Sequence, residues 1–244
     1  MKKLIAIACA ALVGMSAFAF EVSAGARGTF VWDLGTTLEG NQATQMKAYK
    51  DNITAAGGTW NEGGNIGAGF GVWANLGLFD LGSLTLGVQP EFTMSFNQGY
   101  NVSMSQGSNS FTVTYTGTTI DIPVLVTLDV PLNETCALTF GVGPYLSIPM
   151  GFDSITAANG TETKGSDTVT FEAGLNFGLA ADAAFGYKLG IGKLVANVRY
   201  MLDFSPTKVT AKDKTSGATV PGYDNAEMLT RRALQVGIGY QITF

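Results

Sequence analysis

The stretch LQVGIGYQITF, residues 234–244, alternates between apolar side chains and small or polar ones. Successive side chains of a β-strand point to opposite faces, so a period of two residues predicts a strand with one apolar and one polar face. Glycine, glutamine and threonine make up the polar face. The apolar face ends on an aromatic residue and comprises Leu234, Val236, Ile238, Tyr240, Ile242 and Phe244.

The same alternation recurs in seven further segments, with little helical periodicity between them. Together with 234–244 they predict an all-β, eight-stranded, antiparallel up-and-down barrel. Ten strands are the alternative, if part of 34–64 or the stretch FTVTYTG at 111–117 adds a hairpin. We expect 111–117 to extend the fourth strand instead, with a change of phase near Gly117. The seven segments are 22–33, 65–79, 84–96, 119–130, 137–150, 171–185 and 194–204.

Alternation alone does not say which face is inside, because a soluble barrel or sandwich buries its apolar face and a membrane barrel turns it toward lipid. Charged residues are 14% of the chain, whereas about 25% is typical of soluble domains. The segments are also long for soluble strands, and a tilted membrane-spanning strand needs roughly 9–11 residues. Both observations favour a transmembrane barrel.

The connections between the segments alternate in length. The short ones fall at 80–83, 131–135 and 186–192, and the long ones at 34–64, 97–118, 151–168 and 205–228. Short turns on one side and long loops on the other are the pattern of outer-membrane barrels. We therefore expect short periplasmic turns, long extracellular loops and both ends of the barrel domain on the periplasmic side.

The chain begins with MKKLIAIACAALVGMSAFAFEV, in which two lysines precede a short apolar run and small residues. This pattern predicts a secretory signal peptide over residues 1–19, followed by the barrel domain over 20–244. A buried helix, a membrane anchor or a lipoprotein signal at Cys9 fits the pattern less well. Without 1–19 the chain keeps 12 basic and 19 acidic residues, a poor composition for binding nucleic acid. Cys136 is then the only cysteine, which leaves no disulfide framework.

Four stretches resemble the small outer-membrane β-barrels of diderm bacteria: TTIDIPVLVTLDV, LTFGVGPYLSI, VANVRYMLDFS and VGIGYQITF. That group includes the OmpX, OmpW and OmpA-transmembrane types and the PorT-like "outer membrane protein beta-barrel domain" families. The resemblance extends over the whole of 20–244 and implies an outer-membrane location with lipids around the barrel. It also implies that the barrel-assembly machinery reads the C-terminal residues Tyr240, Ile242 and Phe244 during insertion.

Ionisable residues occupy the polar, inward face of several predicted strands. Because a lone buried charge is costly, we expect these groups to pair with one another. The paired charges form either a salt-bridge plug that closes the lumen or a narrow charge-lined path for a small solute. By strand position, Arg27, Glu91, Asp121 and Arg199 are expected near mid-barrel, and Glu172, Asp203 and Arg231 nearer the extracellular mouth.

The chain contains no histidine, which excludes Ser-His, Asp-His and Cys-His mechanisms and makes a zinc or copper site improbable. The glycines of GAGFG at 67–71 lack the strand-turn-helix setting of a nucleotide loop and are expected to make room inside a narrow barrel. We therefore expect no enzyme, no cofactor and no metal.

Two long polar connections, 34–64 and 205–228, are expected to be flexible extracellular surface, with a short helix near 43–50. They are candidates for binding an extracellular ligand through Trp60 and Tyr223. The first functional hypothesis is thus a structural, surface-exposed barrel that displays polar loops for adhesion or host interaction. A narrow passive pore for small solutes is the alternative, and a soluble secreted β-barrel binding protein is the third.

Overall fold

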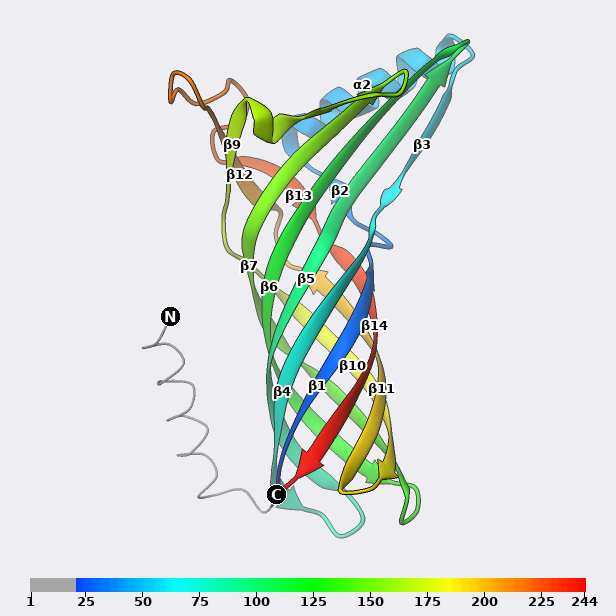
Figure 1. Cartoon of the computed structure of the whole chain (residues 1–244), viewed down its shortest axis with the longest axis vertical. Coiled ribbons are helices and arrows are strands. Elements are labelled where there is room, and N and C mark those ends of the chain that lie inside the picture. Colours follow the sequence, from blue (N-terminus) through cyan, green and yellow to red (C-terminus); the bar gives the residue numbers. More distant parts are fainter. Residues whose placement is uncertain (1–20) are drawn as a thin grey trace.

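The computed structural model describes residues 21–244, so the predicted signal peptide lies outside the described residues. Eight antiparallel strands form a closed ring in chain order, with β14 pairing β1 and β10 pairing β7 (Figure 1). The predicted eight-stranded up-and-down barrel is confirmed. The strands are β1 (Glu21–Trp32), β4 (Ile66–Asp80), β5 (Thr85–Gln106), β6 (Asn109–Pro131), β7 (Cys136–Ala158), β10 (Asn176–Leu189), β11 (Gly192–Asp203) and β14 (Arg232–Thr243).

The barrel has its apolar side chains outside and its polar side chains inside. Phe30 and Ile238 on the outer face are 71% and 65% exposed, whereas Arg199 and Gln235 on the inner face are each 1% exposed. Such a surface is stable only in an apolar medium, and a closed ring leaves no backbone edge unpaired there. The ring therefore spans a membrane through strands. No helix within residues 21–244 combines the length and the apolar character needed to cross a bilayer.

This orientation predicts a large cost for a charge on the outer face. Val142 lies midway along the barrel part of β7 and is 51% exposed. In a soluble protein, Val142→Arg at so exposed a site changes stability by about 0.5 kcal/mol or less. In a bilayer we expect it to lower the free energy of unfolding by about 2–4 kcal/mol. Urea unfolding from lipid vesicles measures the difference, with Asn61→Arg on exposed β3 as the control, and equal effects would contradict a membrane-spanning β7.

Strands β5, β6 and β7 continue beyond the ring and carry a second folded unit, which we name the extracellular module because barrels of this type turn their long connections outward (Figure 1). Strands β3 and β8 extend the sheet of β5–β7, and a four-stranded sheet has the order β2-β13-β12-β9. The added elements are β2 (Thr37–Leu38), α2 (Gly40–Ala55), β3 (Thr59–Gly64), β8 (Thr161–Lys164), η1 (Gly165–Asp167), β9 (Val169–Ala173), β12 (Thr207–Asp213) and β13 (Ala226–Thr230).

The module corrects the sequence-based view of the long connections. Segments 97–118 and 151–168 are largely strand rather than loop. Segment 34–64 contains β2, α2 and β3, and segment 205–228 contains β12 and the start of β13 on either side of an irregular stretch at 214–225. The stretch 111–117 lies within β6 and extends it above the ring, as expected, so the ring keeps eight strands. The helix expected near 43–50 is longer and covers Gly40–Ala55.

The module has an apolar core, the reverse of the barrel below it. Partly buried side chains, which include Trp60, Phe152 and Tyr223, pack against a cluster of buried residues. Burial of these apolar groups stabilises the module as it would any water-soluble sheet domain. The buried residues are Tyr100, Val102, Val113, Tyr115, Val209 and Met228.

An extra residue in β5 marks the change from the polar interior of the barrel to the apolar core of the module. Ser95 and Tyr100 are both buried although they are five positions apart, and the pairing of β5 with β6 shifts between Ser95 and Gln98. Asn97 and Gly99 have positive φ values of 58° and 150°, and a Cβ on Gly99 would lie 2.0 Å from the Tyr115 carbonyl oxygen. This bulge exchanges the faces of β5, so its even-numbered apolar residues turn from lipid toward the module core.

Candidate functional site in the barrel interior

Two layers of paired charges cross the barrel interior. In the lower charge layer, which comprises Arg27, Glu91, Asp182 and Arg199, the guanidinium of Arg199 donates to both oxygens of Glu91 at 2.6 Å and to Asp182 at 2.8 Å. Arg27 donates to the same Glu91 carboxylate. These side chains are at most 5% exposed. Two guanidinium groups against two carboxylates leave the layer neutral, which a dry interior requires.

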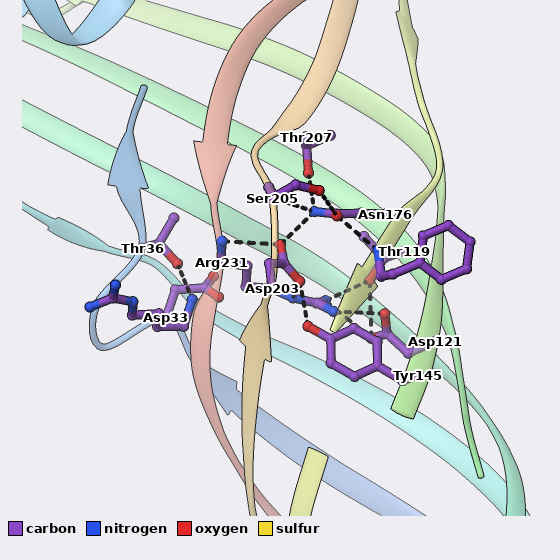
Figure 2. A network of polar contacts seen from close by, with 12 residues as sticks. Asp33, Thr36, Thr119, Asp121, Tyr145, Asn176, Asp203, Ser205, Thr207 and Arg231 are labelled. Carbon is purple, nitrogen blue, oxygen red and sulfur yellow. Dashed lines mark hydrogen bonds and ion pairs between the residues drawn. The ribbon is translucent and has the colours of Figure 1, made fainter. Parts of the chain in front are cut away.

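The upper charge layer, formed by Asp121, Tyr145, Asn176, Asp203 and Arg231, closes the extracellular mouth (Figure 2). The Arg231 guanidinium donates to both Asp121 oxygens, at 2.8 and 3.1 Å. Asp203 accepts hydrogen bonds from the Tyr145 hydroxyl, from Asn176 Nδ2 at 2.8 Å and from the Arg231 backbone N–H at 3.1 Å. The layer therefore ties β6, β7, β10, β11 and the β13–β14 junction together.

Glycines opposite large inward rings make these layers fit. A Cβ on Gly25 would lie 2.4 Å from the Trp73 ring, and one on Gly178 would lie 2.5 Å from the Tyr145 ring. The Arg27 guanidinium carbon lies 5.2 Å from the centre of the Trp73 ring, and that of Arg231 lies 5.3 Å from the centre of the Tyr145 ring. Each arginine thus has an aromatic face beside it as well as a carboxylate.

Some of the residues predicted from the sequence lie at other heights in the lumen than expected, and they pair accordingly. Arg27, Glu91 and Arg199 come together, but Asp121 pairs with Arg231 at the mouth rather than near mid-barrel. Asp182 and Tyr145 also belong to the network, although they are not among the residues expected there from the sequence. Alternation marks a side chain as inward, but the stagger of neighbouring strands decides its height in the lumen.

Glu172 lies outside the barrel, and its expected place in the interior network is wrong. It belongs to β9 of the four-stranded sheet, where its side chain is 57% exposed and forms an ion pair with Lys212 at 2.9 Å. The physical reason is a break at residues 174–175, between β9 and β10. Residues on either side of this break belong to different sheets, so one alternation across 171–185 does not hold.

On the module, Glu62 fastens α2 to the sheet. Its carboxylate accepts hydrogen bonds from Lys50 Nζ at 2.8 Å, Trp60 Nε1 at 3.0 Å and the Tyr100 hydroxyl at 3.0 Å. Trp60 and Tyr223 both pack against the module core, so they are not the protruding contacts that the sequence suggested.

The Lys50 hydrogen bond, with those of Trp60 and Tyr100, holds the pKa of Glu62 below its ordinary value of 4.5. A carboxyl group with a lowered pKa stabilises the fold above its ordinary pKa, and this contribution is lost as the pH falls through the folded-state value. Because the group is partly exposed, we expect under about 1 kcal/mol. Thermal unfolding at pH 7 and pH 3 should show a gap in stability between wild type and Glu62→Gln that is narrower at pH 3. A gap of the same size at pH 3 would contradict the assignment.

The C-terminal strand closes the ring. Its residues pair with β1 and β11 along the whole barrel, and the Tyr240 hydroxyl donates to the Leu189 carbonyl at 2.6 Å. Phe244 is 80% exposed on the outer surface at the end with short turns. Recognition of Tyr240, Ile242 and Phe244 by the assembly machinery stays a prediction.

Outer-membrane barrels are among the solved structures similar to this chain. Neisserial surface protein A matches at 11% identity and a TM-score of 0.44, over 91% of this chain and 97% of that one. Outer membrane protease OmpT of Escherichia coli matches at 9% and 0.45, over 93% and 97%, and Ail, the attachment invasion locus protein of Yersinia pestis, at 12% and 0.35, over 91% and 97%. A scan of family models and a sequence search of curated proteins found no match. At these identities the likeness concerns the barrel fold alone.

The class of the protein follows from its own geometry. A closed antiparallel ring, an apolar outer surface and a polar, charge-paired interior together define an integral β-barrel of the outer-membrane type.

Proposed function

We propose that this protein is a non-enzymatic outer-membrane barrel that holds a folded module at the cell surface, where the module contacts an extracellular partner. The observation that carries this proposal is that β5, β6 and β7 each run from the barrel into the module. Their lower halves belong to the ring, whose lumen is closed by two charge layers, and their upper halves belong to a module with its own apolar core. A rigid platform of this kind suits adhesion or display.

The closed interior argues against the pore. Glu91, Arg199 and Arg27 meet across the lumen from β5, β11 and β1, and the side-chain exposures of these three residues are at most 3%. The upper charge layer, with Arg231, and the module core lie above these three residues. A conducting path requires both layers to part, which breaks buried ion pairs at a cost of several kcal/mol.

Planar-bilayer recording on refolded protein tests this choice. We expect wild type to give no stable single-channel steps, because the two charge layers block the lumen. Stable steps that disappear when Glu91 or Arg199 is neutralised would overturn the proposal in favour of a solute pore. Partition of the protein into the aqueous phase of a detergent extraction would instead favour a soluble secreted barrel.

The proposal of a non-enzymatic role is based on the residue types available. With no histidine in the 244 residues, the usual general base of outer-membrane hydrolases is missing. Within residues 21–244, the buried carboxylates of both layers are engaged by arginine, amide or hydroxyl groups. Groups engaged in this way are poorly placed to exchange protons with a substrate.

A further inference from the structure

Below the lower charge layer, at the end with short turns, the barrel contains a polar cavity of about 190 Å³. Arg27 and Asp182 lie at its inner end, and Asn75, Asp129 and Lys193 are among the lining residues of its walls. At about 30 Å³ per water molecule, the volume holds roughly six waters or one small solute. The two charge layers separate this cavity from the extracellular side.

Several polar groups at this cavity lack partners within residues 21–244. The Nε–H of Arg27 has no acceptor, and its side chain is 3% exposed. The Oδ1 atom of buried Asn75 has no donor. Lys193 forms no ion pair with any described residue, and Asp129 accepts only from Asn75 Nδ2 at 3.2 Å and from Thr139, with no cation beside it. Buried polar groups are rarely left unsatisfied, so the unpaired atoms of Arg27 and Asn75 point to an occupant.

The ring places the opposite charges on facing walls. Arg27 on β1 and Lys193 on β11 lie on strands that flank β14. Asp129 lies on β6, three strands away from β1 in one direction and from β11 in the other. In an eight-stranded ring that separation is nearly the full width of the lumen. Arg27 and Lys193 therefore lie on one side of the cavity and Asp129 on the other. Two more carboxylates line it: Asp182 is already paired with Arg199, and Glu21 is exposed at the start of β1.

We propose that this cavity is a binding site for a small zwitterion of the amino-acid class. Its carboxylate lies toward Arg27 and Lys193, and its ammonium group lies toward Asp129. A ligand with one charge leaves the opposite wall unmatched and must still lose its hydration on entry, so it binds more weakly. This site faces the periplasm and does not depend on what the extracellular module contacts.

Isothermal titration of the full refolded barrel in detergent micelles tests the proposal with glycine as the probe. We expect saturable binding with a Kd on the order of 1 mM, as suits a ligand of so few atoms. Acetate and methylammonium, which each carry one of the two charges, should bind about tenfold more weakly. Trp73 lines the cavity and should report binding by a change in fluorescence.

Two substitutions and their matched controls locate the site. Lys193→Met and Asp129→Asn should each weaken glycine binding about tenfold. Lys188→Met removes a lysine directly opposite Lys193 in the β10–β11 register but outside the cavity lining, and Glu134→Gln removes an exposed turn carboxylate; both should leave the affinity unchanged. No saturable glycine signal, equal affinity for acetate, or an unaffected Lys193→Met would overturn the proposal. If Asp129→Asn fails to fold, Lys193→Met, at a partly exposed residue, decides alone.

Discussion

Glu91→Ala is expected to lower the free energy of unfolding by about 3–5 kcal/mol, the usual cost of removing one partner from a buried charge group. Glu91 accepts from Arg199 twice, from Arg27, and from Gln89 at 2.7 Å. Without it, Arg27 has no carboxylate partner within residues 21–244, and Arg199 retains Asp182 alone there. Two positive charges then face one negative charge in a dry interior. Urea unfolding of the micelle-bound protein, followed by tryptophan fluorescence, measures the change.

Glu172→Ala is the matched control because it removes the same side chain from an exposed ion pair with Lys212. We expect it to change stability by at most about 1 kcal/mol. Glu91→Gln should fall between the two, since an amide oxygen still accepts from one guanidinium. If Glu91→Ala and Glu172→Ala lower the free energy of unfolding by the same amount, the lower layer is hydrated rather than closed. The argument that the barrel does not conduct then fails as well.

The ring itself follows from the sequence because alternation is a local property. Each strand carries its own inward and outward faces, and short turns such as 131–135 force neighbours to pair. The charge partners do not follow so simply. Arg199 and Glu91 are 108 residues apart on β11 and β5, and Arg231 and Asp121 are 110 apart. Their meeting depends on strand stagger, which alternation does not encode.

The extracellular module was missed for a different reason. Its apolar residues, such as Val102 and Val113, lie in stretches that are otherwise polar or rich in glycine. The bulge at Asn97–Gly99 also breaks the alternation of β5 between its two halves. The usable signal was the change of phase near Gly117, where the apolar positions of β6 move from one face to the other. A reversal of that kind along one continuous strand indicates passage from lipid to water.

Val102→Asp is expected to unfold the extracellular module while leaving the barrel intact. Val102 is 0% exposed at the centre of the module core, among Tyr100, Val113 and Met228. An unpaired carboxylate there costs several kcal/mol, more than a core of six buried residues can bear. Trypsin added to intact cells should then cut at Lys208 and Lys212, which strand pairing of β12 protects in the wild type.

Heat-modifiable migration on gels should persist in Val102→Asp, because the ring below the bulge keeps its pairing and both charge layers. Ser105→Asp is the control: it adds the same charge to β5 at an outward position, and we expect wild-type resistance to trypsin. Rapid cleavage of the wild type would restore the view of 205–228 as a flexible loop. Loss of the barrel together with the module would mean that the two interiors fold as one unit, so that the polarity reversal in β5 joins them energetically as well as in sequence.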